Sequence, residues 1–288
     1  MAFPAYTKTM HNKSYPSIDP SRPELSAAGK VVLITGGGAG LGPRFVNSFA
    51  KAGATKIAIL GRRPGPLEDT KKEIESKYPG VKVLTFVADI ADKDSTFKAF
   101  AGTKEAFGPI DIFISNAAYL SAPQKIKDAD IDDYMKGAEI NIKGTLIVSQ
   151  AFLANAAENA NYLSISTAGI HVPAVPFGIS GYVSTKLAAA KIVEYLALEN
   201  PNIKVKDFHP GVLPTDMNAK SAKGGLELPL DDIDLPANYA VWIASPEGDF
   251  LSGRFTWASW DVDELKAKKD ELEKDPSLLL LGLNGWPA

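Results

Sequence analysis

A glycine-rich segment directly follows a short apolar run near residue 30. The run is Val31–Ile34, and the segment is Thr35-Gly36-Gly37-Gly38-Ala39-Gly40-Leu41-Gly42. Glycines permit a tight turn and let backbone N–H groups approach a pyrophosphate, whose charge a helix N-terminus favours. A flexible turn is the alternative reading of the glycines alone. The strand expected before the segment and the helix expected after it favour dinucleotide binding, and Pro43-Arg44 disfavours a Walker-type nucleotide loop.

The rest of the chain alternates between strand-like and helix-like segments. Helices are expected from about Gly42 to near Gly53, over Pro66–Tyr78, and over Val262–Lys274. The alternation predicts an α/β fold with a doubly wound parallel sheet and helices on both faces. The expected strands are Val31–Ile34, Lys56–Leu60, Val81–Val87, Ile110–Ser115, Tyr162–Ile165, Ile203–Phe208 and Arg254–Trp257.

No internal repeat or linker divides the chain, so we expect a single domain over residues 30–260. Residues 1–29 are expected to form an irregular N-terminal arm, because four prolines block regular structure there. Residues 261–288 are expected to form a terminal helix followed by an apolar tail.

Composition excludes several classes of function. The chain has 288 residues, a net charge of −3, no Cys and three scattered His, so thiol catalysis and a metal site are not expected. The absence of a basic run argues against a nucleic-acid partner. No apolar run reaches membrane-spanning length and no signal-peptide core is present, so we expect a cytoplasmic protein without a membrane partner.

The end of the second expected strand bears on the choice of cofactor. An acidic residue there binds the ribose hydroxyls of NAD, whereas Arg suits a 2′-phosphate. The chain has Gly61-Arg62-Arg63 at this place, which favours NADP(H), although two solvated surface Arg remain the alternative. Asp89 ends the third strand and either binds the adenine amino group or caps the next helix. Asn116-Ala117-Ala118 closes the fourth strand, where small residues let a cofactor lie close.

Two further features supply catalytic groups. Tyr182 and Lys186 lie four residues apart, on one face of an expected helix, where the ammonium is expected to lower the phenol pKa toward neutrality. Ser166 ends the fifth expected strand at the carboxyl edge of the sheet. Ser164 and Thr167 are its rivals, but Ser164 lies further from the edge, so Ser166 is the better donor to a substrate oxygen.

With these motifs in this order, the chain resembles the short-chain dehydrogenase/reductase family from roughly Lys30 to Trp257. The Rossmann cofactor loop Thr-Gly-x-x-x-Gly-x-Gly, the Asn-Ala-Gly motif, the Asn-Ser-Tyr-Lys tetrad and the Pro-Gly motif all find counterparts. Two departures are Ala118 in place of Gly and a longer segment between the Ser and the Tyr. The matching residues are Thr35, Gly36, Gly40, Gly42, Asn116, Ala117, Asn141, Ser166, Tyr182, Lys186, Pro210, Gly211, Val212 and Thr215.

The proline-rich N-terminal arm and the ending Phe255–Asp261 resemble those of fungal members. The family resemblance implies NADP(H)-dependent reduction of a carbonyl or oxidation of the alcohol. It implies that Tyr182 is the general acid, that Lys186 lowers its pKa and binds the nicotinamide ribose, that Ser166 binds the substrate oxygen, and that Asn141 holds a proton-relay water. It also implies a homodimer or homotetramer. Expected cofactor contacts are Thr35, Gly36, Gly38, Gly40, Leu41, Gly42, Arg62, Arg63, Asp89, Ile90, Asn116, Ala117, Tyr182, Lys186, Pro210, Gly211, Val212 and Thr215. Imine reduction, isomerisation and a non-catalytic dinucleotide sensor are the alternatives.

The substrate pocket is expected between the loop before Tyr182 and the segment after Gly211. Both segments are mostly apolar, which predicts a neutral, fairly bulky ketone or aldehyde, and Gly224–Gly225 is expected to hinge a lid. The alternative is that these apolar residues pack internally or against another subunit. The expected lining residues are Ile170, His171, Val172, Pro173, Val175, Pro176, Phe177, Leu213, Pro214, Met217, Ser221, Ala222, Lys223, Gly224 and Gly225.

Overall fold

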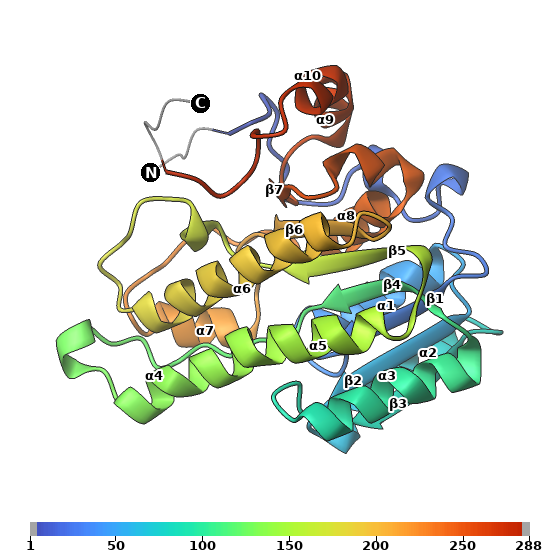
Figure 1. The fold of residues 1–288 in the computed structure, drawn as a ribbon, viewed down its shortest axis with the longest axis horizontal. Helices are drawn as coiled ribbons and strands as arrows, with labels where there is room; N and C mark the ends of the chain where they lie inside the picture. Colours follow the sequence, from blue (N-terminus) through green and yellow to red (C-terminus); the bar gives the residue numbers. More distant parts are fainter. Residues whose placement is uncertain (1–4, 284–288) are drawn as a thin grey trace.

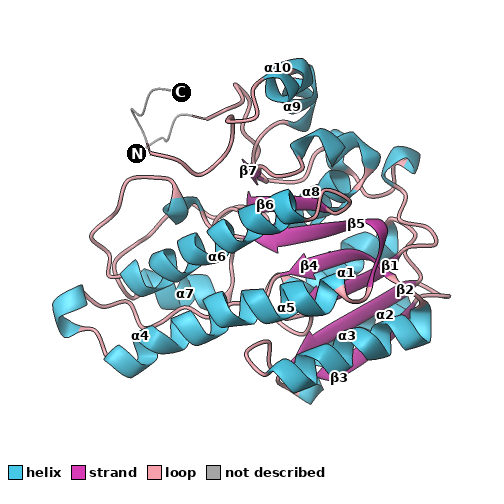
Figure 2. Cartoon of the chain, in the orientation of Figure 1, coloured by secondary structure: helices cyan, strands magenta, loops and turns pink. Residues whose placement is uncertain are grey.

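The computed structural model describes residues 5–283 of the chain, which form one parallel seven-stranded sheet between two layers of helices (Figures 1 and 2). The strands lie in the order β3-β2-β1-β4-β5-β6-β7. Their bounds are β1 Val31–Thr35, β2 Lys56–Gly61, β3 Lys82–Val87, β4 Ile110–Ser115, β5 Ala156–Ile165, β6 Lys204–His209 and β7 Phe255–Trp257. The doubly wound parallel fold predicted from the alternation is confirmed.

The two faces of the sheet carry separate apolar cores. Val32 and Ile34 of β1 pack on one face, whereas Val31 and Leu33 pack on the other. This period-2 division explains why β1 is an unbroken apolar run. Helices α1 Gly42–Lys51, α2 Pro64–Lys77 and α8 Asp234–Ala244 pack against the first face. The opposite face is covered by α3 Lys93–Phe107, α5 Gly144–Leu153 and α6 Ser180–Glu199 (Figure 1).

Strand order places the functional segments at one edge of the sheet. The chain runs outward from β1 to β2 and β3, then crosses back to β4 on the other side of β1. The loops after β1 and β4 therefore diverge at the carboxyl edge, and open α/β sheets bind ligands in the crevice that this divergence leaves. Helices α4 Ile131–Gly137 and α7 Asp216–Ala222 flank this edge.

The N-terminal arm packs against the C-terminal part of the chain instead of extending away from it. Backbone N–H groups of Lys8 and Thr9 donate to the carboxylate of Glu264, at 2.6 and 3.0 Å. Met10 forms an antiparallel bridge with Trp260. Figure 1 shows this blue segment beside the red helices. The first four residues of the predicted arm and the last five of the predicted tail lie outside the described residues.

The terminal segment differs from the expectation of one helix over Val262–Lys274. It forms two short helices, α9 Val262–Ala267 and α10 Lys269–Lys274, because Lys268 leaves the helical region with φ −96° and ψ 6°. The tail then runs along the free edge of β7, where the N–H of Phe255 donates to Leu279 O at 2.9 Å. Within residues 5–283, no helix is long and apolar enough to cross a membrane.

Candidate active site

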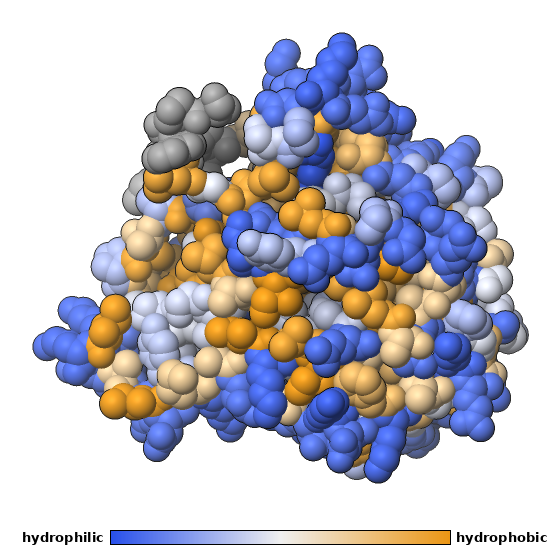
Figure 3. Space-filling model, viewed as in Figure 1, coloured by the Kyte–Doolittle hydropathy of each residue, from blue (hydrophilic) through white to orange (hydrophobic). Residues whose placement is uncertain are grey.

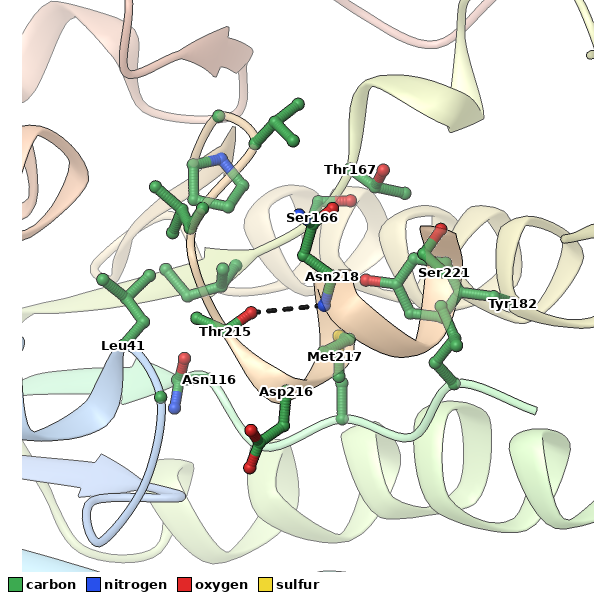
Figure 4. A pocket seen from close by; sticks show the side chains of 18 of the residues that line it. Leu41, Asn116, Ser166, Thr167, Tyr182, Thr215, Asp216, Met217, Asn218 and Ser221 are labelled. Atoms are coloured by element: carbon green, nitrogen blue, oxygen red, sulfur yellow. Dashed lines mark hydrogen bonds between the residues drawn. The ribbon is translucent and has the colours of Figure 1, made fainter. Parts of the chain in front are cut away.

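A cavity of about 1310 Å³ opens at the carboxyl ends of the strands. Its floor is formed by residues at the ends of β2, β5 and β6 and by residues that directly follow β1, β3 and β4. Figure 4 shows Ser166 and Tyr182 around one part of this space, together with Asn218 and Ser221 of α7, and Leu41 and Asn116 at the opposite end of the view. The sequence-predicted residues therefore converge on one cavity. Thr35, Gly42, Asn141 and Lys186 are not among its lining residues and lie behind the wall.

The glycine-rich loop is held in the conformation that a dinucleotide loop requires. Gly36 adopts φ +70°, a region that side chains rarely occupy, and its N–H donates to Leu60 O at 2.8 Å. A Cβ on Gly42 would lie 2.0 Å from Gly36 O, so only glycine permits this close turn. Thr35 Oγ1 accepts from the N–H of Asn116 at 2.9 Å, which ties the ends of β1 and β4 together.

The end of β2 presents two guanidinium groups to the cavity. Arg62 and Arg63 both line it, and Arg62 lies 3.9 Å from the carboxylate of Asp89. The side chain of Asp92, not Asp89, caps α3 by accepting from Ser95 N at 2.8 Å. The capping alternative for Asp89 is therefore wrong, and Asp89 is left facing the cavity.

The end of β5 carries the candidate serine. The N–H of Ser166 donates to Phe208 O at 2.8 Å, which holds the serine against β6, and Ser166 lines the cavity. Ser164 is buried below the edge and is not among the lining residues. Its register partner on β6 is Asp207, a buried carboxyl that the sequence analysis missed.

Asp207 is a buried carboxyl that interacts with Lys186, Ser164 and Ser166. Burial raises the pKa of its carboxyl to about 6, although the charge of Lys186 and the hydroxyls of Ser164 and Ser166 oppose that rise. Burial likewise lowers the pKa of the Lys186 ammonium, and the Asp207 charge opposes that shift. The two groups therefore stabilise one another's charged forms inside the protein. No sequence signal marked Asp207, because a carboxyl in mid-strand has no characteristic motif.

Tyr182 and Lys186 lie on the first turns of α6, as predicted. Burial raises the pKa of the Tyr182 hydroxyl to about 12, so the expectation of a phenol pKa near neutrality does not hold for the structure. The physical reason is burial, which disfavours the charged phenolate. The Lys186 Nζ donates to the backbone carbonyl of Ile165 at 2.6 Å. Tyr182 is consequently a protonated donor across the neutral range.

Asn141 lies in a π-helical segment, Ala138–Lys143, between α4 and α5. Its side-chain oxygen accepts from Tyr119 N at 2.8 Å, and its Nδ2 donates to Tyr119 O at 2.7 Å and to Thr185 Oγ1 at 3.0 Å. Such wide turns occur often at functional sites. The amide thus joins the exit of β4 to α6, one residue before Lys186.

The loop after β6 is fixed by a second carboxylate. Gly211 adopts φ +97°, and a Cβ there would meet Asp231 Oδ2 at 2.5 Å. The N–H of Val212 donates to that oxygen at 2.9 Å, and Asp231 N donates to Val212 O at 2.7 Å. Thr215 caps α7 by accepting from Asn218 N at 3.3 Å (Figure 4). This places Pro210, Gly211, Val212 and Thr215 along the cavity wall.

The expected substrate loops contribute in part. Val172, Val175, Phe177, Leu213, Met217, Ser221 and Gly225 line the cavity, whereas Ile170, His171, Pro173, Pro176, Pro214, Ala222, Lys223 and Gly224 are not among its lining residues. Ile170 joins a buried cluster, and His171 accepts from Trp257 Nε1 at 2.9 Å. The sequence analysis missed lining residues that come from distant segments, namely Met10, His11, Asn12, His209, Leu226, Leu228, Asp231, Trp257 and Ser259.

Comparison with known proteins agrees with this geometry. The family model for short chain dehydrogenase matches residues 30–225. The chain is 33% identical over 285 residues to the short chain dehydrogenase/reductase AacuD of Aspergillus aculeatus, covering 98% of both chains. It is 34% identical over 290 residues to a short chain dehydrogenase/reductase of Claviceps purpurea, covering 98% of this chain and 95% of that one.

Solved structures show the same architecture. A short chain dehydrogenase from Burkholderia cenocepacia, determined in complex with NADP, matches with a TM-score of 0.72 and 26% identity, over 82% of this chain and 98% of that one. A blue fluorescent protein from a metagenomic library, determined in complex with NADPH, matches with a TM-score of 0.71 and 25% identity, over 80% and 96% of the two chains. The chain therefore belongs to the short-chain dehydrogenase family of oxidoreductases, and it resembles fungal members of that family.

Proposed function

We propose that the protein is an NADP(H)-dependent oxidoreductase that reduces a carbonyl group or oxidises the corresponding alcohol. The observation that carries this proposal is the convergence of Ser166 and Tyr182 on one cavity that also receives Arg62 and Arg63. Two hydroxyl donors at one end and two guanidinium groups at the other fit a reacting oxygen and a phosphorylated cofactor, respectively.

The residues present fit the cofactor. Gly36 and Gly42 make a loop that side chains would obstruct, and Arg62 and Arg63 supply the donors that a 2′-phosphate needs. Outside the glycine-rich loop, most of the remaining expected contacts line the same cavity, whereas Lys186 does not. Those that line it are Asp89, Ile90, Asn116, Ala117, Tyr182, Pro210, Gly211, Val212 and Thr215. When bound, NADP(H) supplies or accepts the hydride, and the protein supplies geometry and the proton.

The four catalytic residues then take distinct roles. Tyr182 donates its proton to the substrate oxygen during reduction, because burial keeps the phenol protonated. Ser166 donates a hydrogen bond to the same oxygen and stabilises the charge that develops there. Lys186 holds α6 to the end of β5 through its bond to Ile165 O, with Asp207 as its buried counter-charge. Asn141 fixes α6 to the exit of β4, and its segment is where a proton-relay water would be held.

The substrate is proposed to be a neutral, fairly bulky ketone or aldehyde. Within residues 5–283, the Lys and Arg side chains that line the cavity are Arg62 and Arg63, both at the cofactor end. An anionic substrate would therefore lack a cationic partner beside Ser166 and Tyr182. The walls at that end include Val172, Val175, Phe177, Met217 and Leu226, which favour an apolar ligand body.

A homodimer or homotetramer is proposed, with an interface on the face formed by α4, α5 and α6. Met135, Leu146 and Leu187 on these helices are 56%, 48% and 42% exposed. Figure 3 shows hydrophobic side chains gathered on this side of the molecule. Apolar side chains grouped on neighbouring helices are typical of a subunit interface. Sedimentation of the parent and of Leu146→Glu tests this: a parent that sediments as a monomer contradicts the proposal.

The proposed activity is tested by following NADPH oxidation with a panel of neutral ketones and small oxo-acids. We expect turnover of at least one apolar ketone and better kcat/KM for such ketones than for the oxo-acids. A protein that binds NADPH but consumes none with any carbonyl substrate would instead be a dinucleotide sensor. Better turnover of a charged oxo-acid would overturn the substrate class but leave the reaction class intact.

A further inference from the structure

Three residues of the N-terminal arm line the same cavity as the catalytic groups. They are Met10, His11 and Asn12, and they lie beside Trp257 and Ser259 at the end of the cavity away from Arg62 and Arg63. The matched family segment begins only at residue 30, so this wall lies outside the part of the chain that defines the family.

The arm is bound tightly enough to act as a wall. His11 N donates to Ser259 O at 2.7 Å, and His11 Nε2 lies 2.8 Å from the Asp261 carboxylate. The imidazole of His11 stacks on Tyr15 with a centroid distance of 3.5 Å. Together with the pairing of Lys8 and Thr9 with Glu264, these contacts hold the segment on both sides of Met10.

The arm also connects to the loop that follows β6. Asn12 O accepts from Asp232 N at 2.8 Å, and the neighbouring Asp231 pairs with Val212 through two hydrogen bonds. The arm and the loop after β6 therefore form one hydrogen-bonded unit around the substrate end of the cavity. A substrate that extends away from Tyr182 on this side meets the arm.

The chemistry of this end suits a flat aromatic body. His209 lies edge-on to Trp257 with a centroid distance of 4.9 Å, and Trp257 stacks parallel to Trp260 at 6.1 Å. Met10 adds a polarizable thioether and His11 adds a second ring to the same wall. Aromatic edges and methionine sulfur both make favourable contacts with aromatic ligands.

Resting on the function proposed above, we infer that residues 10–12 form the distal wall of the substrate site and select elongated, multi-ring aromatic ketones over single-ring ones. The arm thereby acts as a specificity element, and the reaction itself remains with Ser166 and Tyr182. The selection is assigned to the side chains of Met10 and His11, two of the residues that line the cavity.

Two probes that share one reacting group test this inference. Acetophenone and 2-acetylanthracene carry the same acetyl group on one ring and on three rings. Their dissociation constants are measured with NADP⁺ present, so that no turnover occurs, using 2-acetylanthracene fluorescence and displacement of it by acetophenone. The parent is expected to bind 2-acetylanthracene more tightly than acetophenone.

The variants are Met10→Ala and His11→Ala, with Lys13→Ala as the matched control, because Lys13 is an exposed arm residue that is not among those lining the cavity. We expect Met10→Ala and His11→Ala to raise the dissociation constant of 2-acetylanthracene about fivefold to tenfold. The dissociation constant of acetophenone is expected to rise less than about twofold. Lys13→Ala is expected to change neither. Met10 is 44% exposed, so the Met10→Ala variant is expected to fold. It therefore keeps the test valid if the His11→Ala variant unfolds.

Equal effects on both ketones, or no effect of either variant, would overturn the inference. Binding is measured without turnover, so the two proposals fail separately. If ketone binding depends on the arm but no ketone is reduced, only the proposed activity is contradicted. If ketones are reduced but their binding does not depend on the arm, only the inferred role of the arm is contradicted.

Discussion

Lys186 Nζ donates to the carbonyl oxygen of Ile165 at 2.6 Å, directly before Ser166 in the chain. One buried hydrogen bond therefore links α6, which carries Tyr182, to the end of β5, which carries Ser166. This bond fixes the placement of Tyr182 relative to Ser166, and Asp207 supplies the negative charge that accompanies the buried ammonium.

Replacing Lys186 with Met is expected to destabilise the fold as well as to reduce turnover. The variant removes the hydrogen-bond donor to Ile165 O and the positive charge that favours the Asp207 carboxylate, which costs roughly 1–3 kcal/mol in the free energy of unfolding. The loss should be larger at pH 8 than at pH 5, because burial raises the Asp207 pKa to about 6 and the carboxyl is protonated at the lower pH. Urea unfolding at both pH values measures it, with exposed Lys191→Ala on the same helix as the control.

Ser166→Ala is expected to lower kcat/KM by roughly 10²-fold, because one preplaced donor to the developing oxyanion is removed. Ser164→Ala is the matched control, since Ser164 lies two residues earlier on the same face and does not line the cavity. Steady-state kinetics on a ketone substrate decide between them. A larger loss in Ser164→Ala would show that the donor has been assigned to the wrong serine.

Arg62→Ala is expected to weaken NADPH binding by roughly 1–3 kcal/mol, because a charge-assisted contact with the 2′-phosphate is lost. The binding of NADH is expected to stay nearly unchanged. The measurement is kcat/KM for both cofactors in the parent and the variant. Arg44→Ala serves as the control, since Arg44 lies on α1 and is not among the cavity-lining residues. Equal use of NADH and NADPH by the parent would refute the cofactor preference.

His209→Phe is expected to reduce the sensitivity of the fold to acid. Burial, aided by His171, lowers the pKa of His209 from 6.5 to about 3. As pH falls, His209 is protonated in the unfolded chain before it is protonated in the folded protein. The stabilisation that neutral His209 contributes is therefore present above pH 6.5 and is lost as pH falls toward 3. Between pH 6.5 and 5 the free energy of unfolding of the parent should fall by about 1.6 kcal/mol more than that of the variant. Thermal or urea unfolding at several pH values checks this, and parallel losses in both proteins would contradict it.

The sheet was predictable because β1, β2 and β4 are apolar runs that alternate with helical segments, and a parallel sheet requires that alternation. The positions of Ser166, Tyr182 and the glycine loop followed from motifs at strand ends and on a helix face. The walls of the cavity could not be predicted in the same way. Met10 and Trp257 are 247 positions apart in the sequence, and only tertiary packing of the arm brings them to one cavity.

The phenol pKa shows a second limit. The spacing of Tyr182 and Lys186 places both on one helix face, but spacing does not reveal where the ammonium points. Its bond to Ile165 O and the burial of the hydroxyl become apparent only with the fold in hand. Asp207 was missed for a related reason, since its role depends on the register of β5 with β6 and not on a local pattern.

The central claim is that Tyr182 gives the proton to the substrate oxygen, and the most direct test is the single-turnover rate of Tyr182→Phe. The variant removes one hydroxyl and keeps the ring. We expect NADPH affinity, measured by cofactor fluorescence, to stay within about twofold, and the rate to fall by roughly 10² or more. Near-normal turnover with a fully folded variant would contradict the assignment.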